Sequence, residues 1–442
     1  MPLASVPVTG VLVLTGSAYL IVILLLVVTR APLGSVLFFT AILVMQCAYT
    51  VMMARVWTMP RASRSVMFSA FALAVAFRMP LALAPVGPDN DMIRYLWDGR
   101  VQRLGYNPYL VLPSDPAMAH THTDDTARMP SLRTRTPYPP AAQLFFRLVV
   151  GLKDSALAMK LALVGCDLLT ALVLWRWLVA TRRNEWLTLT YAWNPLVILE
   201  VAHSGHMDTL GALWIVASAY WLVRNRTMLS AVAFVLAVAS KLLPIVLLPL
   251  YWRRVRPRDA AFAGILLAAL YFRFSHEGSL TFGSVPNVVA HIRFNGPVFA
   301  ALAAWSAPQT AAVVAVALGL AAAAIGRWRL RATDPEAWAW PMALSLACAP
   351  VVYPWYLLYL TPFLFVRATL PLTVWAFTSF STYIVWYQVR QGGRWIVPGW
   401  IMVIEYGIVV AAAIALIVFN SRVEQAATAS SASRPPPSHP RT

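Results

Sequence analysis

The chain has 442 residues, of which 60% are hydrophobic and only 12% are charged. Soluble domains carry roughly 25% charged residues, so this composition excludes a single water-soluble globule and indicates a polytopic α-helical membrane protein. The formal net charge of +18 does not indicate nucleic-acid binding, because the arginines are scattered between apolar segments and form no single stripe.

The apolar segments predict an all-α transmembrane bundle. A spanning helix needs about 20 apolar residues, and several of the segments are shorter, as is common for broken or partly embedded helices that protein covers from lipid. We expect about 13 helical segments in one domain over residues 1–420. The segments run roughly over residues 10–29, 35–54, 65–85, 156–180, 186–202, 207–223, 228–252, 259–274, 298–325, 336–350, 354–366, 370–388 and 397–420.

Arginines in the short loops predict the orientation of the bundle. They cluster near residues 55–64, 182–183, 224–226, 253–258 and 327–331, and the positive-inside rule places all of these loops in the cytoplasm. This requires that segment 228–252 enters and returns as two short helices, broken near Ser240, Lys241 and Pro244. Both termini then face the cytoplasm, and segments 86–155 and 275–297 face the other side. Residues 421–442 are rich in Ala, Ser and Pro and should form a disordered tail.

The outer loop 86–155 begins with a predicted amphipathic helix. On a helical wheel its polar residues share one face and its apolar residues the other, as expected of a helix on the membrane surface that ends at Gly105. The polar face could be an interfacial anchor with an internal Arg–Asp pair. It could equally carry a catalytic carboxylate, with Arg94 positioning it or binding a phosphate. The polar residues are Asp91, Arg94, Tyr95, Asp98 and Gln102.

This run also carries a family resemblance. Asp-x-x-Arg-Tyr-x-Trp-Asp-Gly-x-Val-Gln, followed by Gly-x-Asn-Pro-Tyr, resembles a signature of bacterial polyprenyl-phosphate-sugar-dependent glycosyltransferases of the GT-C superfamily. It is most similar to the mannosyltransferase-like group, which includes the mycobacterial enzymes that build phosphatidylinositol mannosides and lipomannan. The resemblance implies a general base on the outer loop at Asp91, with Asp89 as the second choice. Asn90 stands where many relatives have a second Asp, which argues against a paired-carboxylate metal site.

Residues 200–208 form a second polar segment, at the outer end of a helix. The segment resembles the Gly-His-Asn-Asp motif of the same group, with Met207 in place of Asn. Glu200 shares a helix face with His203, and His206 and Asp208 would point into a crevice and bind substrate. The alternative is a polar cluster that caps the next helix, where Asp208 suits a first-turn position.

Later segments add further candidate residues. Lys241 lies in an apolar segment, where a lysine is costly and indicates either a functional site or snorkelling at a helix break; it could hold a donor phosphate. Asn295, within Phe-Asn-Gly-Pro, and Tyr353, within Tyr-Pro-Trp-Tyr, are similar to motifs of the group. Relatives often have His where Tyr353 stands. The neighbouring Trp355 and Tyr356 bind substrate or are interfacial aromatics. The sequence names no partner for Asp167 or Glu405.

These residues lead to an expected function. The resemblance implies a hexosyltransferase of the bacterial inner membrane with its site on the periplasmic face. The enzyme would move a sugar from a polyprenyl phosphate to a lipid- or glycan-linked hydroxyl, and mannose is the first choice for that sugar. Asp91 would take the proton and Arg94, Lys241 or His206 would stabilise the leaving phosphate, with inversion at the anomeric carbon. We expect no cofactor, no metal and no nucleic-acid partner, and contacts with membrane lipids.

A flippase or transporter of lipid-linked saccharides is the alternative function. Such a protein would need polar residues through the whole bundle and a path that opens on both sides. The polar residues of this chain concentrate at the outer side, which favours an enzyme.

Overall fold

The computed structural model describes residues 7–58, 63–86, 90–277 and 282–432, with side chains as far as residue 422. Within these ranges the chain is helical and no β-strand is present; an isolated parallel bridge joins Phe294 to Val351. The predicted all-α polytopic bundle is confirmed. Among the described residues, six helices are long and apolar enough to cross a membrane: α1 (Val8–Thr29), α2 (Val36–Thr58), α3 (Arg64–Leu83), α6 (Ala156–Ala180), α14 (Pro308–Arg329) and the Gly399–Arg422 part of α18.

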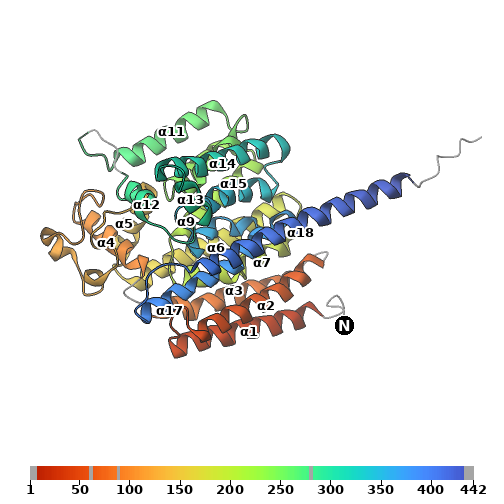
Figure 1. Ribbon diagram of the computed structural model, residues 1–442, viewed down its shortest axis with the longest axis horizontal. Coiled ribbons are helices and arrows are strands. Elements are labelled where there is room, and N and C mark those ends of the chain that lie inside the picture. Colours follow the sequence, from red (N-terminus) through yellow and green to blue (C-terminus); the bar gives the residue numbers. More distant parts are fainter. Residues whose placement is uncertain (1–6, 59–62, 87–89, 278–281, 433–442) are drawn as a thin grey trace, which may run out of the picture.

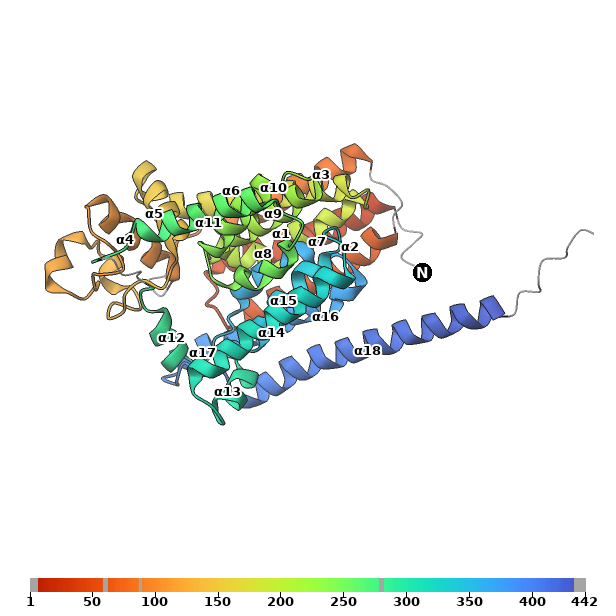
Figure 2. The same cartoon turned by 90° about the horizontal axis from the view of Figure 1, so that it is seen from above.

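The long helices lie roughly along one direction (Figures 1 and 2). Helix α1 packs against α2 and α3, α9 (Asp208–Val223) packs between α6 and α10 (Thr227–Val238), and α14 packs against α15 (Pro335–Ala347). Helix α18 (Gly399–Ala432) packs on α16 (Leu370–Thr378) and projects beyond the other helices. The second half of the chain also contains α11 (Pro257–Phe272), α12 (Val285–His291), α13 (Pro297–Ala303) and α17 (Ile384–Arg390).

Several predicted spans are broken into short helical pieces. Residues 186–202 form η4 (Glu185–Thr188), α7 (Leu189–Ala192), α8 (Pro195–Val197) and the π-helix η5 (Ile198–His203), and residues 354–363 form η7 (Pro354–Tyr359) and η8 (Thr361–Phe363). Prolines cause many of these breaks, because proline lacks an N–H and clashes with the preceding turn. The predicted break in segment 228–252 is confirmed: α10 ends at Val238, and the 3₁₀ helix η6 (Leu243–Tyr251) follows.

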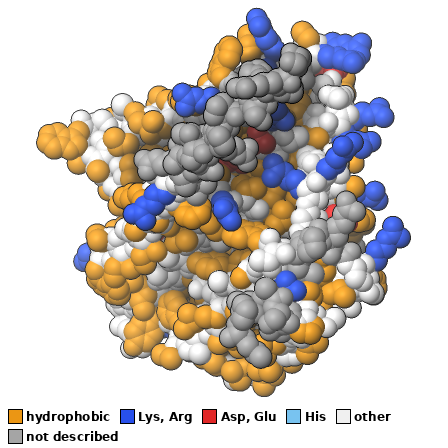
Figure 3. Space-filling view, turned by 90° about the vertical axis from the view of Figure 1, so that its right-hand side faces the viewer, with side chains coloured by type: hydrophobic (Ala, Val, Ile, Leu, Met, Phe, Trp, Pro, Cys, Tyr) orange, Lys and Arg blue, Asp and Glu red, His pale blue; other side chains and the backbone are white. Residues whose placement is uncertain are grey.

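A cap covers one end of the bundle. It consists of α4 (Asp91–Arg103), α5 (Pro140–Leu152) and the loop between them, which carries η2 (Pro116–Thr121) and η3 (Thr126–Arg128). The cap lies opposite the end that bears the start of α1 and the far end of α18 (Figures 1 and 2). Lysine and arginine side chains dominate the charged groups visible on that other end (Figure 3).

Two sequence expectations differ from the structure. Helix α4 exists, but it does not lie on the surface with a free polar face: Arg94, Tyr95, Asp98 and Gln102 are as buried as its apolar residues. The reason is that α5 and the cap loop pack over the polar face. Residues 421–432, expected in a disordered tail, continue α18 as a helix.

The two unassigned carboxylates have buried partners. Asp167 of α6 forms an ion pair with Arg78 of α3, and both side chains are fully buried. Glu405 of α18 accepts hydrogen bonds from the Asn295 amide, at 3.1 Å to each oxygen, and from the Trp375 indole at 3.0 Å. Polar partners make a buried carboxylate tolerable in a membrane protein. The ion pair of Asp167 joins α6 to α3, and the hydrogen bonds of Glu405 join α18 to α16 and to Asn295.

Candidate active site

The start of α4 is fastened to the segment that follows η5. The Asn90 side chain caps α4 by accepting from the Met92 N–H at 2.8 Å, and it donates to the Ser204 carbonyl at 2.7 Å. Gly205 has a φ of +72°, and a side chain there would come within 2.9 Å of the Met92 sulfur. A glycine therefore permits both the turn and the close approach. Asp91 is thereby held near the first turn of α9.

Asp91 is a half-buried carboxylate that accepts no hydrogen bond and joins no ion pair among the described residues. Burial raises the pKa of Asp91 to about 6. The negative charge of Asp208 adds to this rise, while Lys241 and Arg94 oppose it. These influences place Asp91, Asp208 and Lys241 in one electrostatic group. A carboxylate with this pKa is mostly ionised at neutral pH and more basic than an ordinary aspartate.

Lys241 and Asp208 form the cation–anion pair of the site. Lys241 follows α10, and its ammonium contacts the carboxylate of Asp208, which is the first residue of α9. The ammonium also lies 3.3 Å from the centroid of the Tyr356 ring, which gives a cation–π contact. The Asp208 side chain is buried, whereas that of Lys241 is 24% exposed. Lys241 therefore keeps an open side.

Aromatic rings from two segments stack beside this pair. The His206 ring stacks on Trp355 with centroids 4.0 Å apart, and Trp355 stacks on Tyr353 at 4.3 Å. Tyr353 meets the Tyr356 ring edge-on at 5.6 Å. Because Trp355 is covered on both faces by His206 and Tyr353, neither face is free to stack on a sugar.

Glu200 and His206 form a buried polar pair behind the stack. The Glu200 Oε2 atom lies 3.3 Å from His206 Nε2, and Glu200 Oε1 accepts from the Tyr383 hydroxyl at 2.6 Å. His203 lies three residues after Glu200 in η5 and has its Nδ1 3.5 Å from the Ser204 hydroxyl. Tyr383 belongs to this cluster, and sequence reasoning missed it because nothing local links it to Glu200, 183 residues away.

The middle of α4 carries a closed hydrogen-bond network. Asp98 accepts from Arg94 Nε at 2.7 Å, from the Thr136 hydroxyl at 2.6 Å and from Gln143 Nε2 at 2.8 Å. Arg94 also donates to the carbonyls of Ser131 and Thr134. The network fixes the cap loop and α5 onto α4. The sequence pattern did not mark Thr136 or Gln143 as site residues, and the structure makes them partners of Asp98.

Tyr95 and Asn295 belong to the framework around the site. The Tyr95 ring is buried, stacks on Phe146 at 4.6 Å, and has its hydroxyl 3.5 Å from the Met207 N–H. Asn295 is bound to Glu405, and its neighbour Phe294 packs on Tyr353 at 4.2 Å. The structure therefore brings Asp91, Asp208, Lys241 and Tyr356 together, with Glu200, His206, Tyr353 and Trp355 beside them, and sets Arg94, Tyr95, Asp98 and Asn295 in the surrounding framework.

Asp89 lies outside the described residues. The histidines of the cap loop have other contacts: His122 Nε2 lies 2.9 Å from the Pro113 carbonyl, and His120 lies 3.4 Å from the Tyr106 hydroxyl. In the part of the chain that the structure describes, no three His, Cys, Asp or Glu side chains are grouped so as to hold a metal ion.

Comparison with known proteins assigns the family. A search of curated proteins and a search of solved structures each gave no significant match. The profile of the MptA_B family, described as alpha-(1->6)-mannopyranosyltransferase, N-terminal domain, matches residues 4–255. This range is more than half of the chain and contains the cap, η5, α9 and Lys241. The chain therefore belongs to the MptA_B family of alpha-(1->6)-mannopyranosyltransferases and is a multi-pass membrane glycosyltransferase.

Proposed function

We propose that the protein transfers mannose from a polyprenyl-phosphate donor to a hydroxyl of a lipid- or glycan-linked acceptor, with Asp91 as the general base. The observation that carries this proposal is the contrast between Asp91 and its neighbours. Asp98, Asp208 and Glu200 are all engaged by donors or a cation, whereas Asp91 has no such partner among the described residues. A free carboxylate beside a partly open cation suits a reaction that moves a proton and releases a phosphate.

The proposed reaction is a single displacement. The acceptor hydroxyl attacks the anomeric carbon of mannose, and its proton passes to the Asp91 carboxylate. The bond between the anomeric carbon and the phosphate oxygen breaks, and polyprenyl phosphate leaves with the bonding electrons. Attack opposite the leaving group inverts the anomeric centre. The raised pKa of Asp91, about 6, brings it closer to the operating pH, where a general base is most effective.

Lys241 is the proposed partner of the leaving phosphate. Its ammonium is held by Asp208 and by the Tyr356 ring, and its side chain is partly exposed. Such a preorganised cation stabilises the charge that develops on the leaving group. Asp208 and Tyr356 then act as positioning residues. Arg94, already bound to Asp98 and two carbonyls, holds the cap in place and lowers the pKa of Asp91 through its charge.

The separation of the cap from the basic end supports a proposed orientation. We place the cap on the outer face of the bacterial inner membrane, because the opposite end shows mostly positive charges (Figure 3). A cysteine at the exposed position Arg256 should then resist an impermeant thiol reagent in intact cells and react after lysis. A cysteine at Arg135, exposed on the cap loop, should react in intact cells. The reverse pattern would overturn this orientation.

Purified protein and a synthetic donor test the function. In neutral detergent, the protein should release polyprenyl phosphate from polyprenyl-phosphate mannose only when a mannoside acceptor is present, and the product should carry the inverted linkage. GDP-mannose should not replace the donor. Turnover with GDP-mannose, or an unchanged donor after long incubation with several mannoside acceptors, would contradict the proposal.

A further inference from the structure

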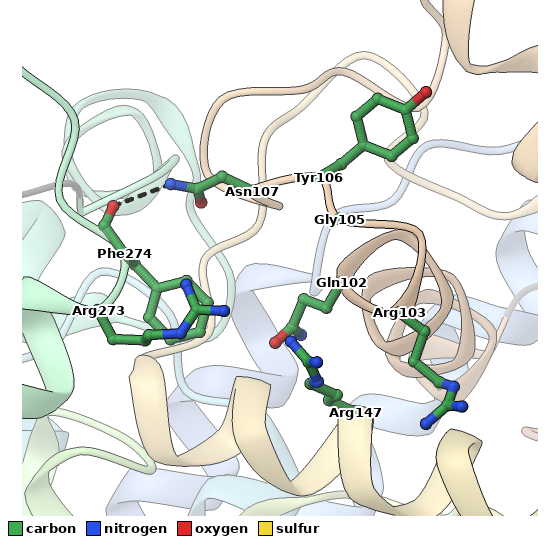
Figure 4. Close-up of a pocket in the computed structure, with 8 residues that line it drawn as sticks. All are labelled: Gln102, Arg103, Gly105, Tyr106, Asn107, Arg147, Arg273 and Phe274. Atoms are coloured by element: carbon green, nitrogen blue, oxygen red, sulfur yellow. Dashed lines mark hydrogen bonds between the residues drawn. The ribbon is translucent and has the colours of Figure 1, made fainter.

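A cleft lies at the far end of α4, between α4, α5 and the end of α11. We name it the three-arginine cleft after Arg103, Arg147 and Arg273 (Figure 4). Its volume is about 230 Å³. The Asn107 amide donates to the Phe274 carbonyl at 2.9 Å and fixes the end of α11 against the start of the cap loop. The cleft is therefore a built feature, with walls from three separate elements.

The charges in this cleft are all positive. No Asp or Glu lines it, and none of its three guanidinium groups has an ion pair or a hydrogen bond to another described residue. The neighbouring Arg100, by contrast, makes two hydrogen bonds to Asp154, at 2.7 and 3.0 Å. Three uncompensated guanidinium groups around one cavity attract an anion, and phosphate fits their forked donors well.

An apolar groove continues from the cleft. A second cavity of about 360 Å³ shares Arg103 and Arg147 and is lined also by Leu144, Leu148 and Leu152. These leucines recur every four residues, so they form one stripe on α5. Leu148 is 61% exposed and Leu152 is 81% exposed. Because α5 ends only a few residues before the membrane-spanning helix α6 begins, this stripe lies at the membrane boundary.

The cleft is too far from Asp91 to hold the phosphate of the reacting donor. Asp91 and Arg103 stand at opposite ends of α4, which rises about 18 Å over this length at 1.5 Å per residue. In the proposed donor, the phosphate is bonded directly to the carbon that reacts near Asp91. A phosphate in the three-arginine cleft must therefore belong to another molecule.

We propose that the three-arginine cleft binds the phosphate of an anionic membrane lipid, whose chains lie along the leucine stripe of α5. The guanidinium groups bind the negatively charged phosphate, and the leucines contact the hydrocarbon chains. A phospholipid carries both of these groups. Gln102 also lines the cleft, and its buried Oε1 atom has no hydrogen-bond partner among the described residues. It accepts a headgroup hydroxyl, which favours a hydroxylated headgroup such as phosphatidylglycerol.

A binding measurement tests this site without any turnover. Purified protein in neutral detergent is titrated with chain-labelled phosphatidylglycerol. Replacing Arg103, Arg147 and Arg273 together by Gln should weaken binding more than tenfold, since each charge-assisted contact at a partly exposed site contributes modestly. The matched control replaces Arg128, Arg133 and Arg135 of the cap loop, which are exposed and line neither cavity. It removes the same charge and should leave binding within twofold.

Competitors separate the possible sources of the phosphate. Unlabelled phosphatidylglycerol should displace the label, whereas inorganic phosphate or zwitterionic phosphatidylcholine should need at least a tenfold higher concentration. Leu148→Gln combined with Leu152→Gln should weaken lipid binding and leave the competition by inorganic phosphate unchanged. Equal displacement by inorganic phosphate, or equal loss of binding in the control triple variant, would overturn the proposal.

Discussion

Helix α4 carries two aspartates on one face with opposite surroundings. Asp98, in the middle of the helix, is fully buried and accepts hydrogen bonds from Arg94, Thr136 and Gln143. Asp91, at the N-terminal end, is half-buried and has no such partner in the described part of the chain. The two positions look equivalent on a helical wheel, and tertiary packing alone separates them.

This difference indicates that the two aspartates of α4 have different roles. A carboxylate whose oxygens already accept strong hydrogen bonds is a poor base, because taking up a proton would break those bonds. A carboxylate that is partly desolvated and unpaired gains basicity. The comparison therefore assigns a structural role to Asp98 and a catalytic role to Asp91. Each of the following substitutions tests one of these two assignments.

The largest effect should come from Asp91→Asn. The substitution keeps the size and removes the base, and general-base catalysis contributes about 10²–10⁴-fold to rate. Turnover of polyprenyl-phosphate mannose should fall by that factor, while donor binding and the thermal unfolding midpoint stay close to those of the wild type. If Asp91→Asn turns over normally and Asp89→Asn does not, the base is Asp89, two residues earlier.

A smaller effect is expected at the neighbouring cation. Lys241→Met removes the charge proposed to meet the leaving phosphate, and a hydrogen bond to a charged group contributes about 1.5–3 kcal/mol. The donor concentration that gives half-maximal rate should rise about tenfold or more. Lys153→Met, at an exposed lysine that follows α5, is the control and should change nothing. Unchanged donor dependence in Lys241→Met would make Lys241 a structural lysine at a helix break.

Asp98→Asn should act on stability and hardly on chemistry. It leaves the buried Arg94 charge without its carboxylate, and breaking a buried ion pair costs about 3–5 kcal/mol. The thermal midpoint in detergent should drop clearly, while turnover per folded molecule, measured at low temperature, should stay within about threefold of the wild type, far from the loss in Asp91→Asn. A stable Asp98→Asn protein that has lost all turnover would contradict the assignment of different roles to the two aspartates.

The sequence predicted the class of fold and the site segments, and the structure added the pairings. Hydropathy and proline positions gave the helical bundle and the break before Lys241, because both depend on local residues. The contacts of Asp208 with Lys241, Glu200 with Tyr383 and Asn295 with Glu405 join distant segments. No local pattern encodes such pairs. The helix α4 was predicted correctly from its local pattern. The burial of its polar face was not, because it depends on α5 and the cap loop.

The pH dependence of turnover tests the role of Asp91 most directly. Because a general base acts only when deprotonated, and the pKa of Asp91 is about 6, the wild-type rate at saturating donor should rise with pH through about 6 and then level off. At pH 5 only about a tenth of Asp91 is ionised, so the rate should be roughly tenfold lower than at pH 7. Asp91→Asn should keep a small residual rate without this rise. A variant that shows the same rise, or that turns over at the wild-type rate, would contradict the assignment of Asp91 as the base.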